Sequence, residues 1–424
     1  MKVLVLAPPL ARAGGIQRYT ATLIRAVKDL LGDESVRCVA MPEVPDRNRH
    51  GRFSTGLKLG YGWRAAREAI RWRPDLIICT HLALGPIGRL LANLHRRPYW
   101  IVVHGIEAWG LLPWWKRAAL RRADRVIVTC AFNREQVVKR HQIDEERIAS
   151  LPCTLDETLL NVEPAGESLL RYLPDDRRVV LTVGRMAAGE RYKGHEVVLR
   201  ALPSVVAKIP SVTYVVVGDG DDRPRLEALA QLLGLTDHVV FTGEMSESEL
   251  AASYHRSEIF ALPARTVIDD HNPKGEGFGI VFLEAMAFGK PVIGPRHGAP
   301  AELIQQGKTG LLVDPEDATS VAEALLSLFS DREAAREMGK AGSDWVRRHY
   351  SYGSLREKLR QILDGQVEGS QPVRSSIKGS RWMKAEILLE ALFVLWVIVV
   401  NVLYYAQFKD LLISRLAQFV YRWR

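Results

Sequence analysis

Residues 178–220 read RVVLTVGRMAAGERYKGHEVVLRALPSVVAKIPSVTYVVVGDG, and this stretch decides the fold. Short apolar runs, Arg178–Val183 and Thr213–Val217, stand near its two ends, and a loop and a helical segment separate them. Strands that are joined through a helix run parallel, because the crossover returns the chain to the same edge of the sheet. The stretch therefore predicts one unit of a doubly wound α/β sheet.

The same alternation of strand and helix patterns occurs in two series along the chain. The first series predicts strands at Lys2–Ala7, Val36–Met41, Asp75–Thr80, Tyr99–Val103 and Arg125–Thr129, with helical patterns that include Ile16–Leu31, Tyr61–Arg71 and Asn133–Arg140. The second series predicts strands at Arg178–Val183, Thr213–Val217, His238–Thr242, Glu258–Leu262, Lys290–Ile293 and Gly310–Val313. We therefore expect two tandem α/β domains that bind ligands at the carboxyl ends of their strands.

A polar, acidic stretch at 156–176 separates the two series and carries no strong period, so it predicts the domain boundary. We expect a first domain at 1–165 and a second domain at 172–345. A helix at 350–365 is expected to pack back toward the first domain.

Composition and charge restrict the class of protein. Of the 424 residues, 47% are apolar and 25% are charged, which is typical of a globular protein. The 58 basic and 49 acidic residues leave a net charge of +9, which favours an anionic partner such as a nucleotide or a phospholipid surface. The basic residues form no groove interleaved with aromatic residues, so no nucleic-acid partner is expected. The four cysteines form no C-x-x-C pair, which favours a reduced cytosolic protein without structural zinc.

The end of the sequence predicts a membrane-associated helical tail at 385–424. It follows a linker at 366–384 that contains Gly, Ser and Pro. Residues 387–406 read ILLEALFVLWVIVVNVLYYA, a stretch of 20 residues long enough to span a bilayer core as a helix. Residues 409–424 have the composition of an interfacial amphipathic helix. The alternative is a long apolar helix buried against the protein or a second subunit.

A second segment also suggests contact with lipid. Trp109–Arg125 reads WGLLPWWKRAALRRADR and combines basic residues with Trp114 and Trp115. This composition fits a helix that rests on anionic lipid. The alternative is an ordinary amphipathic helix whose aromatic side chains belong to the core.

Two cations follow the first strand of the second series. Arg185 and Lys193 suit a pyrophosphate, because arginine offers a planar fork of donors and lysine a point charge. The alternative is a solvated surface loop. Asp219 and Asp221 form a short D-x-D in a turn, which helix capping explains better than a metal site. We therefore expect no metal.

The sharpest signal is KGEGFGIVFLEAM at residues 274–286. Its glycines have no side chains that would block access to the backbone around Glu276. A helix begins beside this residue, and the free amides of its first turn can face a phosphate. Glu284 is the only charge in an apolar helical run, and a buried carboxylate needs hydrogen-bond donors. The two hydroxyls of a ribose are suitable donors. The alternative is a structural arginine or a backbone amide.

Two features of the first series lie at strand ends. Gly14 and Gly15 permit a tight turn before a helix, but the G-x-G-x-x-G spacing of a dinucleotide site is missing. His104 directly follows an apolar strand and precedes a glycine, on the side of the sheet where ligands bind. A plain turn and a structural histidine are the alternatives.

The order of GGIQR, VGR, VGDG, EGFGIVFLEAMAFGKPVI and GKTGLLVDP over residues 1–365 resembles the retaining glycosyltransferases of family 4, which have the two-domain GT-B fold. The resemblance implies that Arg185 and Lys193 bind the diphosphate and that Glu284 binds the ribose. It implies that the transferred sugar is contacted by Glu276 and by the segment of Gly277, Phe278, Gly279 and Ile280. His104 is expected near the reaction centre and Gly15 near the phosphates. Arg185 and Lys193 stand further apart than is usual in the family, so Arg191 could share the phosphate role.

The resemblance also implies a reaction. We expect metal-independent transfer of a hexose from a nucleotide sugar, without another cofactor, through attack on the same face that the leaving phosphate departs from. The EGFGIVFLEA segment resembles that of bacterial mannosyltransferases with a guanosine donor, which slightly favours mannose from GDP-mannose. Trp109–Arg125 and the tail at 385–424 suggest a lipid-linked or cell-envelope glycan as acceptor, at the cytoplasmic face of the plasma membrane. The alternatives are a UDP-sugar donor, a sugar-nucleotide epimerase and a membrane-anchored sugar-nucleotide sensor or assembly subunit.

Overall fold

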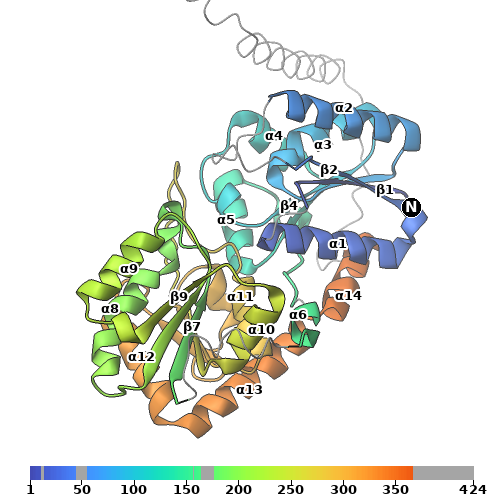
Figure 1. The fold of residues 1–424 in the computed structure, drawn as a ribbon. Coiled ribbons are helices and arrows are strands. Elements are labelled where there is room, and N and C mark those ends of the chain that lie inside the picture. The colour runs from blue at the N-terminus through green and yellow to red at the C-terminus, as the bar shows by residue number, and fades with distance from the viewer. Residues whose placement is uncertain (11–13, 44–54, 156, 164–175, 366–424) are drawn as a thin grey trace, which may run out of the picture. The chain divides into compact units, whose positions relative to one another are not determined.

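The computed structural model describes residues 1–10, 14–43, 55–155, 157–163 and 176–365 (Figure 1). The strands in these ranges form two six-stranded parallel sheets, with the orders β2-β1-β3-β4-β5-β6 and β12-β11-β10-β7-β8-β9. Two compact units divide the described residues, one containing 1–102 and 114–126 and the other 103–113 and the residues from 127 onward. The predicted α/β class with two doubly wound sheets is confirmed.

The first sheet contains β1 (Val3–Ala7), β2 (Val36–Ala40), β3 (Leu76–Cys79), β4 (Tyr99–Val103), β5 (Arg125–Val128) and β6 (Ile148–Ser150). Its helices are α1 (Gly15–Leu31), α2 (Thr55–Trp72), α3 (Gly85–His95), α4 (Trp114–Arg122) and α5 (Ala131–His141), with short turns η1 (Asp33–Ser35), η2 (Leu82–Leu84), η3 (Ile106–Ala108) and η4 (Glu145–Arg147). The predicted strands are all present, and β6 is an additional one. The expected boundary stretch contains a short helix, α6 (Glu157–Asn161), whose Leu159 is buried.

The second sheet contains β7 (Arg178–Val183), β8 (Val212–Val217), β9 (Val239–Gly243), β10 (Ile259–Ala261), β11 (Val292–Pro295) and β12 (Gly310–Val313), as the sequence predicts. Its helices are α8 (His195–Val206), α9 (Arg223–Leu232), α10 (Glu247–Arg256), α11 (Ile280–Ala287), α12 (Ala318–Ser330), α13 (Arg332–His349) and α14 (Tyr352–Leu363). The turns η5 (Ala188–Lys193), η6 (Thr236–His238) and η7 (Ala299–Leu303) complete this part. The side to which α14 packs stays a prediction.

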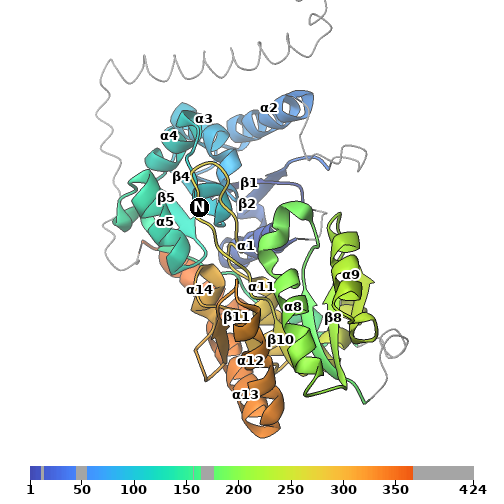
Figure 2. The same ribbon diagram turned by 90° about the vertical axis from the view of Figure 1, so that its left-hand side faces the viewer.

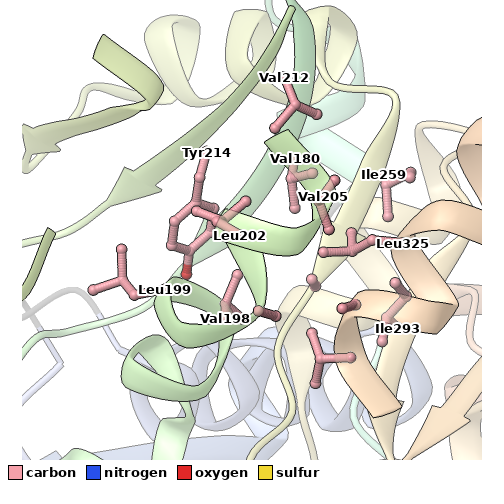
Figure 3. Close-up of a cluster of buried hydrophobic side chains, with 14 of the residues drawn as sticks. Val180, Val198, Leu199, Leu202, Val205, Val212, Tyr214, Ile259, Ile293 and Leu325 are labelled. Carbon is pink, nitrogen blue, oxygen red and sulfur yellow. The ribbon is translucent and has the colours of Figure 1, made fainter. Parts of the chain in front are cut away.

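Alternate side chains of the second sheet build two separate layers of core. Val212 and Tyr214 of β8 face Leu202 of α8 and Leu325 of α12 in one buried cluster (Figure 3). Helix α8 packs on α12, which lies beside it in both views of the ribbon (Figures 1 and 2). On β10, Phe260 stacks edge-on against Phe282 of α11, with ring centroids 5.3 Å apart. Because strand side chains alternate between faces, both faces of the sheet are covered by helices.

Within the described ranges, none of the helices has the length and apolar character needed to cross a membrane. The predicted linker at 366–384 and tail at 385–424, which includes the apolar stretch 387–406, lie outside the described residues.

Candidate active site

The second sheet has a switch point between β7 and β10. The chain leaves β7 toward β8 on one side and leaves β10 toward β11 on the other, so the loops after these two strands diverge. Turn η5 follows β7 and lies against the loop after β10, since the amide of Arg265 donates to the carbonyl oxygen of Tyr192 over 2.6 Å. A Cβ atom on Gly194, whose φ is +84°, would collide with the carbonyl oxygen of Pro263. This packing places Lys193 at the switch point, where ligands of α/β proteins bind.

Four charged side chains meet at this point, and we call Arg185, Glu190, Lys193 and Glu276 the charged cluster. Lys193 forms a hydrogen-bonded ion pair with Glu276 and stands 3.8 Å from a carboxylate oxygen of Glu190. Arg185 pairs with the other oxygen of Glu190. The side chain of Arg185 is 75% exposed, whereas those of Lys193 and Glu276 are only 13% and 17% exposed. The structure thus brings the two predicted phosphate cations and the predicted sugar-binding carboxylate together.

Glycines shape the segment that carries Glu276. Gly279 is the residue before α11 and has φ +101°, a conformation that side chains with a Cβ atom rarely adopt. Gly277 makes a close backbone approach, because a Cβ atom there would lie 2.6 Å from the carbonyl oxygen of His104. Ile280 begins α11, and the amides of a first helical turn have no partner within the helix. Phe278 is buried, and its ring packs edge-on against that of Tyr350, with centroids 6.0 Å apart.

Glu284 is buried in α11 and is only 2% exposed. Its carboxylate accepts a hydrogen bond of 2.8 Å from the hydroxyl of Tyr254 in α10. Tyr254 in turn stacks on Phe288, with ring centroids 5.1 Å apart. One donor to this carboxylate is thus a tyrosine hydroxyl, which the sequence did not reveal. The ribose role of Glu284 stays a prediction.

His104 follows β4 directly and is buried. Its amide donates to the Glu107 carboxylate over 2.6 Å, and its carbonyl oxygen accepts from Asn133 over 3.1 Å. This turn contacts Gly277, so His104 and the glycine segment belong to one site. Gly15, by contrast, is exposed at the start of α1 in the other unit, and its place near the phosphates stays a prediction.

The acidic turn after β8 does not cap α9 as expected. Asp219 accepts from the amide of Gly220 over 2.8 Å, and Asp221 accepts from the amide of Ala188 over 2.7 Å, so Asp221 ties this turn to η5. Asp222 is the residue before α9, but it makes no capping hydrogen bond. In the parts of the chain that the structure describes, no group of three His, Cys, Asp or Glu side chains could hold a metal ion.

Asp222 instead forms a buried ion-pair centre. It pairs with Arg225 over 2.8 Å and with Arg191 over 2.7 Å. The hydrogen bonds from Arg225, and secondarily from Arg191, lower the pKa of Asp222 because they stabilise its charged form. Arg191 therefore pairs with Asp222, which is not a member of the charged cluster.

A buried histidine lies next to the charged cluster at the start of α8. Burial, together with the nearby positive charge of Lys193, lowers the pKa of His195 to about 4. Its Nε2 atom has no hydrogen-bond partner among the described residues. The imidazole is therefore neutral at neutral pH and adds no charge to the site.

Three residues of the site did not emerge from the sequence. Glu190 stands five positions after Arg185 and three before Lys193, a spacing that could have suggested ion pairs. Asn133 is fully buried on α5, on the same face as Val137 and His141. A polar residue in that i, i+4, i+8 pattern was the signal available for it. Tyr254 left no comparable signal.

Comparison with known proteins identifies both parts of the chain. The family model described as "Glycosyltransferase Family 4" matches residues 13–159, and "Glycosyl transferases group 1" matches residues 171–345. A GDP-mannose-dependent alpha-(1-6)-phosphatidylinositol monomannoside mannosyltransferase of Mycobacterium tuberculosis is 35% identical over 299 residues, which cover 69% of this chain and 74% of the relative. The enzyme of the same description from Mycolicibacterium smegmatis is 32% identical over 295 residues, covering 68% and 75%.

Solved structures agree on the fold. HepE of Anabaena in complex with UDP and glucose has a TM-score of 0.69 at 18% identity and covers 86% of this chain and 100% of that one. Sucrose-phosphate synthase of Thermosynechococcus elongatus has a TM-score of 0.69 at 23% identity, covering 86% and 98%. These neighbours confirm the expected GT-B fold. The family models and the sequence relatives show that the chain belongs to the group 1 glycosyltransferases of family 4 and is a hexosyltransferase.

Proposed function

We propose that this enzyme transfers mannose from GDP-mannose to a lipid-linked glycan acceptor, with retention of the anomeric configuration and without a metal ion. The observation that carries the proposal is the charged cluster at the switch point, beside the glycine segment and the first turn of α11. Relatives above 30% identity are described as GDP-mannose-dependent enzymes acting on a phosphatidylinositol mannoside, which supports both the donor and the acceptor class.

The charges suit departure of a nucleoside diphosphate. When the bond between C1 of the sugar and the phosphate oxygen breaks, negative charge grows on the diphosphate. Arg185 is exposed and can bind the phosphates directly. Lys193 is already paired with Glu276, so its ammonium group would be shared between that carboxylate and the phosphates. The amides at the start of α11 add partial positive charge. Such preorganised donors typically contribute several kcal/mol to a transition state.

The same arrangement defines the rest of the reaction. The acceptor hydroxyl oxygen forms a bond to C1 on the face from which the phosphate leaves, and its proton passes to the leaving phosphate oxygen. No carboxylate then has to form a covalent intermediate. We assign Glu276 and the amides of Phe278 and Gly279 to the transferred hexose, and Glu284 to the ribose. We place the buried His104 next to the reacting sugar, because its backbone touches Gly277.

We further propose that the enzyme works at the cytoplasmic face of the plasma membrane. Trp114 and Trp115 of α4 are exposed, with ring centroids 6.0 Å apart, and basic residues surround them in the sequence. Trp109 of the same stretch is instead fully buried, so the expectation of core aromatics holds for that residue. A lipid-linked acceptor would reach the enzyme from the surface on which the exposed tryptophans rest.

The direct test is a donor screen with the full chain. GDP-mannose, UDP-glucose and UDP-N-acetylglucosamine are each supplied with a phosphatidylinositol mannoside acceptor in the presence of EDTA. We expect transfer from GDP-mannose alone, and an α-linked product in proton NMR because the donor is α-linked. Transfer only from a UDP-sugar would overturn the donor assignment, and a β-linked product would overturn retention. Activity that EDTA abolishes and Mg²⁺ restores would overturn the metal-free mechanism.

A further inference from the structure

Helix α5 carries a buried amide at the junction between the His104 turn and the glycine segment. Asn133 is fully buried in its first turn. Its Nδ2 group lies 2.8 Å from the carbonyl oxygen of Gly277, 3.1 Å from that of His104 and 2.8 Å from the Thr129 hydroxyl. Its Oδ1 atom accepts from the indole N–H of Trp109 over 2.8 Å. Both ends of the amide are therefore used, which fixes its orientation.

We propose that Asn133 is a positioning residue for hexosyl transfer, which holds the sugar-binding amides of the glycine segment at a set distance from His104. This inference rests on the proposed function. It adds a residue outside the charged cluster and outside the motifs that the sequence reveals.

The geometry of one peptide group explains how Asn133 acts. The carbonyl oxygen of Gly277 points to Asn133, and a trans peptide directs the N–H of the next residue to the opposite side. That N–H belongs to Phe278, one of the amides assigned to the hexose. It donates to no group in the described part of the chain. Asn133 thus aims a donor at the site without touching the sugar itself.

Trp109 supports the same segment from the side. A Cβ atom on Gly275 would lie 2.9 Å from the indole ring, so the ring packs directly on the backbone next to Glu276. The ring also meets Phe132 edge-on, with centroids 5.3 Å apart. Further along, the amide of Leu111 donates to the carbonyl oxygen of Asp270 over 2.7 Å. The indole N–H that orients Asn133 is therefore itself held in place.

Replacing Asn133 separates this role from a merely structural one. Asn133→Ala removes the amide donor from the carbonyl groups of His104 and Gly277 and leaves them only longer contacts, of 3.4 Å to the Thr129 hydroxyl and 4.0 Å to the Cys130 thiol, so the peptide between Gly277 and Phe278 can turn. We expect kcat with GDP-mannose to fall by about 10- to 100-fold, because a displacement of about 1 Å at a reaction centre can cost about 10². The affinity for GDP, which has no hexose, should change less than about twofold. A loss of GDP affinity equal to the loss of turnover would indicate general disruption and overturn the proposal.

Two variants and a control sharpen the test. Asn133→Asp keeps the acceptor for Trp109 but sets a carboxylate against two carbonyl oxygens, so turnover should be at least as low as in Asn133→Ala. Full turnover in Asn133→Asp would overturn the proposal. Trp109→Phe keeps a ring beside Gly275 and removes only the N–H, and it should lose a few-fold in kcat. Asn161→Ala removes an exposed amide in α6 that donates to the Glu157 carbonyl oxygen over 3.0 Å, and should behave as wild type.

A readout that needs no donor keeps this test independent of the proposed reaction. In nitrogen relaxation measurements on the ligand-free full chain, Asn133→Ala should lower the backbone order parameter of the Phe278 amide relative to Asn161→Ala, because the peptide that Asn133 holds can then turn. An unchanged order parameter there would overturn the positioning role whichever donor the enzyme uses. A wild-type chain that transfers no hexose would overturn the proposed function instead, and the relaxation result would still decide the inference.

Discussion

Glu276 and Lys193 share an ion pair, although the family resemblance assigns them to different parts of a donor. The pair is mostly buried, and Glu190 stands 3.8 Å from the same ammonium group. A diphosphate that binds there competes with two carboxylates for Lys193 and is repelled by both. Under the proposed function, Lys193 would serve two purposes: it would hold Glu276 in place before the donor binds and neutralise phosphate afterwards.

The competition predicts opposite effects of Glu276→Gln on binding and on catalysis. Removing the negative charge should tighten GDP binding a few-fold, on the order of 0.5–1 kcal/mol for a partly screened charge pair. Turnover should fall by roughly 10², because the hexose loses a charged partner that acts in the transition state. Calorimetry with GDP and initial rates with GDP-mannose measure the two effects.

The exposed Glu323 of α12 offers a matched control, and Glu323→Gln should change neither quantity. Weaker GDP binding in Glu276→Gln would contradict the competition. It would mean that the carboxylate supports the phosphate site rather than opposing it.

The buried His195 predicts a loss of stability in acid. Its pKa is lowered to about 4 in the folded chain, whereas an unfolded histidine titrates near 6.5. Between these values the unfolded state binds a proton that the folded state does not, so stability falls as pH falls from about 6.5 to 4. The contribution lost by pH 5 is roughly 2 kcal/mol.

Chemical denaturation of wild type and His195→Gln at pH 7 and pH 5 measures this contribution. Wild type loses this contribution between pH 7 and pH 5, whereas the variant lacks the titrating group and does not. The difference in free energy of unfolding between wild type and variant should therefore be larger at pH 7 than at pH 5. If this difference in free energy of unfolding is the same at the two pH values, the lowered pKa assigned to His195 is contradicted.

Single residues were predictable from the sequence only where a motif marks them. Arg185, Lys193 and Glu276 stand in recognisable segments, and the structure brings them together. The spacing in α5 could have marked Asn133 as buried, but its contact with Gly277 and the contact of Tyr254 with Glu284 join residues 144 and 30 positions apart, and no local pattern encodes such partners. Asp219 and Asp221 were expected to cap a helix because their turn resembles a helix start. Their carboxylates instead accept from the amides of Gly220 and Ala188, which lie outside α9.

At the scale of elements, the strands were predictable because each buried parallel strand is a nearly continuous apolar run. β6 was not predicted because Ile148–Ser150 has three residues, of which only Ile148 and Ala149 are buried. α6 was not predicted because it too is short, and five residues cannot show a helical period. Their place comes from tertiary contacts, such as the amide of Leu151 donating to the carbonyl oxygen of Val128 over 2.9 Å.

The start of α5 depends on a residue far away in the sequence. Glu302 of η7 accepts hydrogen bonds from the amides of Ala131, over 2.9 Å, and Phe132. A carboxylate at a helix start satisfies free amides and interacts favourably with the helix dipole. Because Cys130 gives α5 no side-chain cap of its own, Glu302 takes that role.

Removing this cap should loosen α5 specifically. Glu302→Ala is expected to cost about 1 kcal/mol, which corresponds to about fivefold faster hydrogen exchange in the first turns of α5. Exchange in α12 should stay unchanged. Glu323→Ala, on the exposed face of α12, is the control and should leave α5 as in wild type. Unaltered exchange in α5 of Glu302→Ala would show that other contacts fix the helix start.

At the scale of the whole molecule, the net charge of +9 is unevenly distributed. The segments of α2, α3 and α4 together contain nine basic residues and a single acid, Glu68, which pairs with Arg37. The exposed positions of α2 include Trp63 and Ile70, seven residues apart and therefore on one face, with Arg67 between them. Exposed aromatic and basic side chains on such a face are typical of proteins that lie on anionic lipid.

This distribution predicts salt-sensitive binding of the full chain to vesicles. Sedimentation with vesicles containing 30% phosphatidylglycerol, about the anionic content that gives a strong surface potential, should exceed sedimentation with phosphatidylcholine alone. Binding should weaken as salt rises from about 0.05 to 0.5 M, because the Debye length shortens. Trp114→Ala combined with Trp115→Ala should lower the partition coefficient by roughly tenfold through lost apolar burial. Leu232→Ala is the control, because it removes an apolar side chain that is more exposed than either tryptophan but lies in α9, outside α2, α3 and α4. Its binding should match wild type. If the tryptophan variant binds as wild type does, α4 is not the surface that meets the lipid.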